Sequence, residues 1–282
     1  MSRMAGKVAL ITGAARGMGR SHAVRLAEDG ADIVAIDVCA ELETAPYPGA
    51  AREDLDATAK MVEQLGQRVI ARQADTRDLK ALQSVVDEAI AEFGHIDVVV
   101  ANAGISSFGL AWELTEEAWQ EVIDVNLTGS WKTVKAVIPH MIERNEGGSI
   151  IFISSVQGLI GVPTMAHYTA SKHGMVGLMR ALAAELAQYN IRVNSVNPGN
   201  VGTPMVDNAL MRKMYLPGVS DPTSEDADNV MKQLSALPTG WIDPREISDA
   251  VLYLASHEAR NITGIVLPVD AGMMFPSKLR YD

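Results

Sequence analysis

The segment Thr12-Gly13-Ala14-Ala15-Arg16-Gly17-Met18-Gly19 stands between a short apolar run at 8–12 and an amphipathic stretch at 19–29. Glycines in such a turn let the backbone bend sharply and approach a pyrophosphate, and the start of the following helix offers unpaired N–H groups and a positive dipole end to that anion. Because the glycines lie between an expected strand and an expected helix, we interpret the segment as a dinucleotide-binding turn rather than an ordinary tight turn. The expected binding residues are Gly13, Arg16, Gly17, Met18 and Gly19.

The same alternation of strand and helix continues along the chain. Short runs rich in Val and Ile, typical of strands buried on both faces of a parallel sheet, lie at 8–12, 32–36, 68–72, 96–101, 149–153, 192–196 and 265–269. Amphipathic stretches predict helices at 19–29, 54–65, 79–93, 116–142, 169–188 and 246–256. This order predicts an α/β fold of the Rossmann type, in a single domain over 1–282, with a doubly wound parallel sheet of about seven strands and helices on both faces.

Two segments interrupt the alternation. Residues 38–53 follow the second strand, and residues 202–243, rich in Met, Pro and acidic residues, follow the sixth. Loops of this length in a compact domain are usually functional or mobile, although surface decoration is the alternative. We expect the second segment to form a lid over the substrate.

Asp37 ends the second expected strand, 20 residues after Gly17. A carboxylate at this position accepts hydrogen bonds from the adenine ribose hydroxyls and repels a 2′-phosphate, which favours NAD over NADP. Arg16 argues the other way, because a base beside the turn could hold a 2′-phosphate. We give Asp37 more weight, since its charge is expected directly at the ribose; the alternative is a turn acid at a strand end.

Tyr168 and Lys172 are spaced to lie on one face of a helix. A phenol normally titrates near pKa ~10, and a nearby ammonium is expected to lower that pKa, so Tyr168 is a candidate general acid and base. Ser155, or its neighbour Ser154, follows the fifth strand and is placed to orient a substrate oxygen. Asn126 lies inside a helical run, where it could hold a water that links Lys172 to solvent; local burial as a satisfied polar residue is the alternative.

Composition argues against several other classes of protein. The chain has 24 basic and 35 acidic residues, a net charge of −11, which disfavours nucleic acid and anionic membranes as partners. Its single cysteine, Cys39, allows no internal disulfide and fits a reducing compartment. No stretch approaches the roughly 18–20 apolar residues of a membrane span, and the first apolar run is too short for a signal peptide. We expect a cytoplasmic protein.

Metal chemistry is not expected either. The six histidines show no metal-ligand spacing, and His22 and His167 are expected on helix surfaces. A tyrosine that transfers the proton needs no metal.

Taken together, these motifs resemble the short-chain dehydrogenase/reductase family over nearly the whole chain. Asn126, Ser155, Tyr168 and Lys172 resemble its catalytic tetrad, in which Tyr168 and Lys172 also contact the cofactor. The resemblance implies further cofactor contacts from Asp75 and Thr76 beside the adenine, from Asn102, Ala103 and Gly104 after the fourth strand, and from Pro198, Val201 and Thr203 at the nicotinamide carboxamide. It also implies a homotetramer whose interface uses the helices around 116–142 and 169–188.

A finer resemblance concerns the residues after the glycine turn. Gly19-Arg20-Ser21-His22-Ala23, Asp37-Val38-Cys39 and the 38–53 segment are similar to the mycofactocin-associated branch, which includes carveol dehydrogenase-like enzymes; Met18 departs from the Gln usual in that branch. The resemblance implies an NAD that does not exchange, covered at its adenine end by the 38–53 segment. Electrons would then leave through a peptide-derived redox carrier, mycofactocin.

The predicted reaction is hydride transfer between NAD and a hydrophobic secondary alcohol or ketone, such as a carveol-like terpenoid. The predicted lid is apolar and adaptable, although its apolar residues could instead pack on the core or at a subunit contact. These residues are Met205, Leu210, Met211, Met214, Tyr215, Leu216, Met231 and Leu234. The alternative enzyme is a reductase that uses freely exchanging NAD(P)H on 3-oxoacyl or sugar-type ketones. A nucleotide-binding regulator without turnover has no need of Ser155, Tyr168 and Lys172 together.

Overall fold

The first strand, β1 (Val8–Thr12), is buried along its whole length. Val8 and Leu10 pack into a hydrophobic cluster on one face of the sheet, while Ala9 and Ile11 pack into a second cluster on the other face. A strand covered on both faces consists of a continuous apolar run, which is why this segment shows no polar alternation. The computed structural model describes residues 2–275; Met1 and 276–282, the ends of the predicted domain, lie outside the described residues.

Seven parallel strands form one sheet in the order β3-β2-β1-β4-β5-β6-β7, which confirms the predicted doubly wound fold. The direction of winding reverses between β1 and β4, and ligands bind in open α/β sheets at the carboxyl ends of strands beside such a reversal. The other strands are β2 (Asp32–Asp37), β3 (Val69–Gln73), β4 (Val98–Ala101), β5 (Gly148–Ile153), β6 (Ile191–Pro198) and β7 (Val266–Val269).

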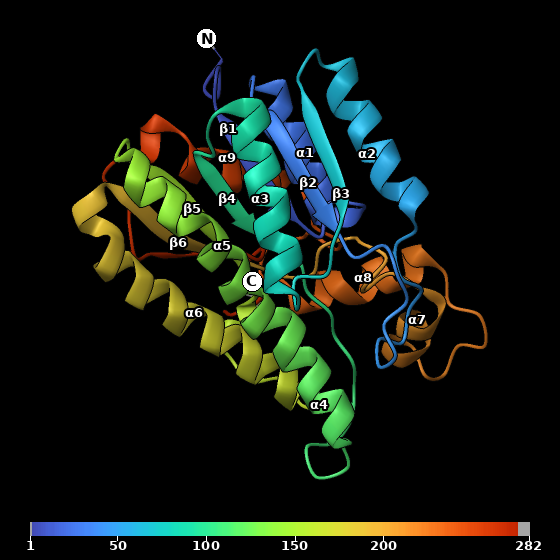
Figure 1. Ribbon diagram of the computed structural model, residues 1–282. Coiled ribbons are helices and arrows are strands. Elements are labelled where there is room, and N and C mark those ends of the chain that lie inside the picture. Colours follow the sequence, from blue (N-terminus) through green and yellow to red (C-terminus); the bar gives the residue numbers. More distant parts are fainter. Residues whose placement is uncertain (1, 276–282) are drawn as a thin grey trace.

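Helices cover both faces of this sheet (Figure 1). On one face α3 (Leu79–Phe93), α5 (Gly129–Arg144) and α6 (Ala166–Leu186) contribute to the first hydrophobic cluster. On the opposite face α1 (Gly17–Glu28), α2 (Arg52–Gln64) and α9 (Pro244–Ala255) contribute to the second. None of the helices within residues 2–275 is both long and apolar enough to cross a membrane.

The predicted helix at 116–142 contains an irregularity. The structure has α4 (Glu116–Ile123), then a π-helical turn (Asp124–Thr128), then α5, with right-handed helical backbone at both junctions. A π turn adds one residue to a helix and leaves the apolar periodicity on either side readable, so the sequence pattern did not reveal it. Such turns are frequent at functional sites, and this one carries Asn126.

The two irregular segments lie together below the carboxyl ends of the strands (Figure 1). Residues 38–51, named the insert from here on, contain no helix or strand, and α2 begins at Arg52, two residues before the predicted end of the loop. The 202–243 segment is not a simple loop, because it contains α7 (Ala209–Tyr215) and α8 (Ser224–Leu234). Asn208 and Thr223 cap these two helices, a signal that is present in the sequence.

Candidate active site

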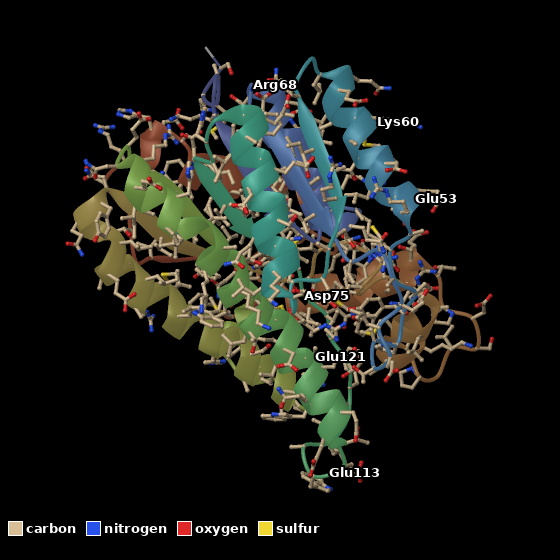
Figure 2. All side chains as sticks on the ribbon, viewed as in Figure 1. Glu53, Lys60, Arg68, Asp75, Glu113 and Glu121 are labelled. Carbon is tan, nitrogen blue, oxygen red and sulfur yellow. The ribbon has the colours of Figure 1, made fainter. Side chains whose placement is uncertain are left out.

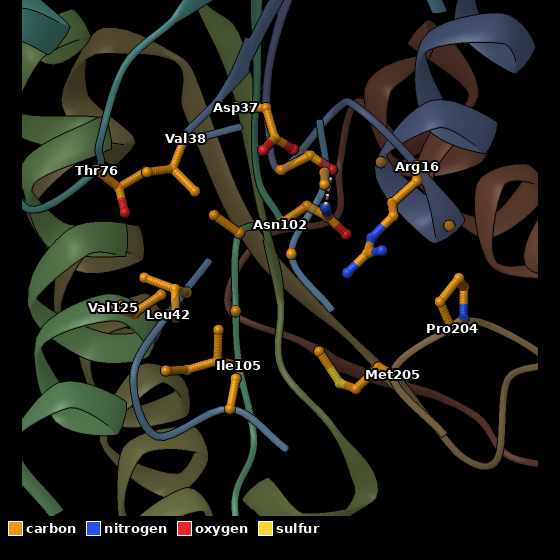
Figure 3. Close-up of a pocket in the computed structure, with 18 of the residues that line it drawn as sticks. Arg16, Asp37, Val38, Leu42, Thr76, Asn102, Ile105, Val125, Pro204 and Met205 are labelled. Carbon is orange, nitrogen blue, oxygen red and sulfur yellow. Dashed lines mark hydrogen bonds between the residues drawn. The ribbon is translucent and has the colours of Figure 1, made fainter. Parts of the chain in front are cut away.

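A cleft of about 1020 Å³, open solvent included, lies at the reversal point of the sheet. Figure 3 shows two of its walls, with Leu42, Ile105 and Val125 on one side and Pro204 and Met205 on the other. The sequence-predicted residues that line it are Gly13, Arg16, Gly17, Met18, Gly19, Asp37, Asp75, Thr76, Asn102, Ala103, Gly104 and Thr203.

The glycine turn needs glycine at two positions for steric reasons. Gly13 has φ +67°, and a Cβ there would lie 2.9 Å from the Cα of Ala103. A Cβ on Gly19 would overlap the carbonyl oxygen of Gly13. The turn is therefore a close backbone cradle, and a group fits against it only where side chains are absent.

The start of α1 is open to an anion. Asp78, Thr115, Thr223 and Asp243 cap α3, α4, α8 and α9, whereas no side chain of residues 2–275 caps the first N–H groups of α1. Free N–H groups and the positive end of the dipole at this position match a pyrophosphate. The residues of the turn therefore fit a dinucleotide.

Asn102 and Thr12 fasten the turn to the end of β4. The Asn102 side-chain amide donates to the Thr12 carbonyl at 2.9 Å, and the Thr12 hydroxyl accepts from the backbone N–H groups of Asn102 and Ala103, each at 3.1 Å. Sequence reasoning did not single out Thr12, whose buried hydroxyl holds two segments of the cleft together.

Asp37 lies in the cleft with its carboxylate held in place. One oxygen accepts from Ala15 N–H and the other from Cys39 N–H, both at 3.0 Å, and each oxygen keeps a lone pair for a further donor. The Arg16 guanidinium donates to the Pro48 carbonyl of the insert. The Arg16 side chain, the basic group that favoured a 2′-phosphate, is thus bonded to the protein, and Asp37 lines the cleft with its carboxylate free to accept further donors.

Tyr168 and Lys172 lie one turn apart near the start of α6, which begins at Ala166. The Lys172 ammonium nitrogen donates to the Ile153 carbonyl at 2.9 Å and lies 5.5 Å from the centroid of the Tyr168 ring. Burial lowers the pKa of Lys172 to about 7.

The expected lowering of the Tyr168 pKa is wrong for this structure. Desolvation by the surrounding protein raises the pKa of Tyr168 to about 12, and the Ser155 hydroxyl offsets this only in part. The reason is the burial of the Tyr168 phenol itself, which disfavours the charged phenolate more than the Ser155 hydroxyl stabilises it.

The two candidate serines have different partners. The Ser154 hydroxyl donates to the Lys172 carbonyl at 3.0 Å, so it is engaged in holding α6. The Ser155 hydroxyl accepts from Gln157 N–H at 3.1 Å and lowers the pKa of Tyr168. The geometry therefore favours Ser155 as the group that acts with Tyr168. Asn197, which the sequence did not indicate, donates to the Ser155 carbonyl at 2.7 Å and fixes its backbone.

Asn126 links the cleft to the catalytic candidates. Its side-chain nitrogen donates to the Ile105 carbonyl at 2.9 Å and to the Ser171 hydroxyl at 3.1 Å, and its oxygen accepts from Ile105 N–H at 2.8 Å. A Cβ on Gly104 would lie 3.3 Å from this oxygen and 3.5 Å from the Lys172 nitrogen. None of the four tetrad candidates lines the cleft itself, but Asn126 and Lys172 lie directly behind Gly104, which does.

The insert reaches farther than the adenine end predicted for it. Leu42 packs with Tyr168 against the small apolar cluster of Ile105, Val122 and Val125. The Tyr47 hydroxyl accepts from Ser106 N–H at 3.2 Å. Both insert residues lie at the end of the cleft near the tetrad candidates, so the insert runs along the whole cleft.

A salt-bridge network fastens the middle of the insert. Glu121 of α4 accepts from the Thr44 N–H at 3.0 Å and from the Thr44 hydroxyl at 2.6 Å. Arg77 bridges Glu121 at 3.4 Å and Asp75 at 2.7 Å. Figure 2 labels Asp75 and Glu121, which lie below the sheet on the side of α4. The insert is thereby tied to a residue that lines the cleft.

Some predicted residues do not line the cleft. Val201 is buried in the second hydrophobic cluster, and Pro198 is the last residue of β6. Among the expected apolar lid residues only Met205 lines the cleft, while Met211 and Met231 are buried away from it. Within 202–243, the short stretch 203–205 is therefore the part that meets the cleft.

The two histidines expected on helix surfaces are fully buried, which corrects that prediction. His22 Nδ1 lies 2.8 Å from the Ser248 hydroxyl and joins α1 to α9, and burial lowers the pKa of His22 to about 3. His167 Nε2 lies 2.7 Å from the Ser107 hydroxyl. A polar residue in a helix is buried when a partner arrives from a distant segment, and helical spacing does not reveal that partner.

The lining residues that sequence reasoning missed are mostly apolar loop residues. They include Val38, Leu42, Tyr47, Ile105, Val125 and Pro204, whereas Met205 is one of the predicted lid residues. One signal was available: Tyr47 stands between Pro46 and Pro48, so its backbone is restricted before folding.

The chain is similar to proteins of known class along almost its full length. The family model for short chain dehydrogenases matches residues 7–213. (-)-trans-Carveol dehydrogenase of Rhodococcus erythropolis is 47% identical over 273 residues, which are 96% of this chain and 99% of that protein. Carveol dehydrogenase from Mycobacterium avium, crystallised in complex with NAD, has a TM-score of 0.96 and 47% identity, covering 97% of this chain and 99% of that chain. A short chain dehydrogenase from Mycobacterium paratuberculosis, bound to NAD, has a TM-score of 0.88 and 44% identity, covering 96% of this chain and 98% of that chain.

Proposed function

This chain belongs to the short-chain dehydrogenase family, and we propose that it transfers a hydride between NAD and a hydrophobic secondary alcohol or ketone. The observation that carries the proposal is that the cleft and two of the catalytic candidates adjoin at Gly104. Gly104 lines the glycine-cradled cleft that also contains the fixed carboxylate of Asp37, and Asn126 and Lys172 lie directly behind Gly104. The NAD-bound relatives of similar fold support the choice of cofactor.

In this proposal the turn at 13–19 binds the pyrophosphate, Asp37 binds the adenine ribose, and Asp75 and Thr76 lie beside the adenine. The nicotinamide ring of NAD supplies the carbon that accepts or gives the hydride. Thr203 lines the cleft where the carboxamide is expected, whereas Pro198 and Val201 do not line it. Lys172 contacts the nicotinamide ribose.

Tyr168 holds or moves the substrate proton at its phenol oxygen. A pKa of about 12 keeps the phenol protonated at neutral pH, which suits protonation of an alkoxide during ketone reduction. Alcohol oxidation needs the phenolate, so we expect that direction to become faster as pH rises. Ser155 donates to the same substrate oxygen, and Asn126 positions the 104–106 backbone and α6 while completing a proton relay with Lys172.

The substrate we propose is a carveol-like terpenoid or a similar apolar alcohol. Two relatives of similar length are named carveol dehydrogenases. The cleft wall beside the tetrad candidates is apolar, with Leu42, Ile105, Val125 and Met205. An apolar wall favours such a substrate by removing its hydrocarbon surface from water.

We further propose that NAD stays bound through turnover and that a peptide-derived redox carrier, mycofactocin, removes the electrons. The insert supports this, because Arg16, Glu121 and Ser106 all hold it along the cleft. A cofactor beneath it leaves only after these contacts break.

A homotetramer is also proposed. Between α5 and α6 lies a groove whose lining includes Trp131, Ile138 and Leu186, and Trp131 is 40% exposed. Exposed apolar surface of this kind is typical of subunit contacts. Light scattering tests this directly, and a monomer would count against it.

The experiment that tests the function mixes purified protein with excess NAD and carveol and follows the absorbance of reduced nicotinamide. A burst at or below one equivalent per subunit, restarted by an artificial electron acceptor, supports bound NAD. Product far beyond one equivalent means freely exchanging NAD and supports the alternative reductase. Tyr168→Phe is the control: it should bind NAD like wild type and show no turnover, and a near-normal rate would defeat the assignment.

A further inference from the structure

Tyr47 is the aromatic residue of the insert, and it is buried although the insert is a loop. Pro46 and Pro48 flank it and restrict the backbone on both sides, so the ring is presented with little conformational freedom to lose. Its side chain lines the cleft together with Gly104 and Ile105. A buried phenol on a loop needs hydrogen-bond partners, and these identify its role.

The first partner is Ser106. Its N–H donates to the Tyr47 phenol oxygen at 3.2 Å, and both the amide and the hydroxyl of Ser106 lower the pKa of Tyr47. Burial outweighs them and raises that pKa, so the phenol stays neutral and keeps its proton. Because Ser106 approaches the phenol oxygen as a donor, the phenol proton is available to an acceptor on the cleft side.

The second connection runs to the catalytic candidates. Ser106 follows Ile105, whose backbone is bound by Asn126, and Asn126 donates to the Ser171 hydroxyl of α6. Ser171 in turn donates to the Tyr168 carbonyl at 2.7 Å. Tyr47 is also close enough to Tyr168 to raise its pKa electrostatically. The insert is therefore joined to the tetrad by one continuous set of bonds.

We propose that Tyr47 is a cofactor-binding residue whose hydroxyl accepts from Ser106 N–H and donates its proton to an oxygen of the bound dinucleotide. The inference rests on the proposed NAD-dependent function and adds a contact that comes from the insert. Binding of the dinucleotide then orders the insert and the 104–106 backbone together.

The test compares Tyr47→Phe with wild type and with Tyr253→Phe, a control on α9 that removes a half-exposed hydroxyl far from the cleft. Each protein is stripped of NAD by partial denaturation and refolding, and NAD binding is then measured by calorimetry. Thermal unfolding is measured with and without NAD. We expect Tyr47→Phe to weaken NAD binding about tenfold, as the loss of one hydrogen bond predicts. The unpaired Ser106 N–H should also lower the unfolding temperature of the NAD-free protein, and the unfolding temperature with NAD should fall further. Tyr253→Phe should match wild type.

A purely structural role gives a different result. If Tyr47→Phe lowers the unfolding temperature equally with and without NAD and leaves NAD affinity unchanged, the proposal is overturned. Wild-type protein that binds no NAD overturns the proposed function itself, which separates the two failures. A second measurement, hydrogen exchange of wild type, does not depend on any variant: peptides from 38–51 and 104–108 should gain protection together on adding NAD. Protection of 104–108 alone contradicts the proposal.

Discussion

The side-chain amide of Asn126 binds both backbone polar groups of Ile105, accepting from its N–H at 2.8 Å and donating to its carbonyl at 2.9 Å. Ile105 lies beyond the end of β4 at Ala101, so Asn126 supplies the hydrogen bonds that a neighbouring strand would otherwise make to its backbone. It holds the backbone at the junction of the cleft and the tetrad candidates. The π turn that carries Asn126 therefore acts as a support for a loop on which both halves of the site depend.

Asn126→Ala should lower the free energy of unfolding by about 2–3 kcal/mol, because two buried backbone groups lose their partner. We also expect kcat to fall at least tenfold while the KM for the alcohol changes less, since the loop beside Lys172 moves. Urea unfolding and steady-state kinetics measure these effects. Asn261→Ala, at an exposed position, is the control. Full activity in a destabilised Asn126→Ala protein would show that the loop does not position the reacting groups.

Asp37→Ala should weaken the binding of NAD to protein stripped of its cofactor by roughly tenfold or more and lower the preference for NAD over NADP by a larger factor. The carboxylate both binds a ribose and repels a 2′-phosphate, so its removal acts on the two cofactors in opposite directions. The ratio of the two dissociation constants, obtained by calorimetry, is the measurement, because any general damage from the lost Ala15 and Cys39 contacts cancels in it. An unchanged ratio would place the discriminating group elsewhere.

Glu121→Ala should release the insert and speed the loss of NAD by roughly tenfold, because hydrogen bonds to a charged group contribute about 1.5–3 kcal/mol. The rate of NAD release is measured by dilution into a trap enzyme, and limited proteolysis reports on residues 38–51. Glu113→Ala is the matched control, since Glu113 lies on an exposed loop away from the insert (Figure 2). Equal release rates in the two variants would mean that the hydrogen bonds between Glu121 and Thr44 do not retain the cofactor.

Lys172 should make stability depend on pH. Its pKa is about 7 in the folded protein against an ordinary 10.5, so between these values the unfolded chain carries a proton that the folded chain lacks. The contribution of Lys172 to stability therefore rises with pH across this window and is smallest below pH 7, where a buried ammonium must be accommodated.

Lys172→Met removes this titration. The gain in stability of the variant over wild type should be largest near pH 6 and should shrink toward pH 10, as followed by thermal unfolding. Lys60→Met, at an exposed position on α2, should show no such trend. A pH-independent difference between Lys172→Met and wild type would contradict the lowered pKa.

The sheet and most of the cleft could be predicted from the sequence because their residues obey local rules. A fully buried strand such as β1 must be apolar, and a turn such as Gly13–Gly19 must lack side chains where backbones touch. Asn102 and Asp37 follow strands at the edge where ligands bind in this fold. These steric and burial requirements act on residues close together in the sequence, so the choice of amino acids there reveals them.

The rest depends on contacts between distant segments. Leu42 and Tyr47 reach the catalytic end because Glu121 holds Thr44 from 77 residues away. His22 is buried because Ser248, 226 residues later, offers a hydroxyl. The raised pKa of Tyr168 follows from burial of its own phenol by the surrounding protein, which the spacing of Tyr168 and Lys172 does not express. No local pattern encodes these pairings.

The uncapped start of α1 has a consequence for how long the protein survives. A helix end left open by the chain is completed by the ligand, and a ligand that binds only the folded state adds about 2.7 kcal/mol of stability at one hundred times its dissociation constant. Resistance to heat and to proteases then follows the supply of dinucleotide. The amount of folded enzyme that persists should therefore depend on how much NAD was available to it.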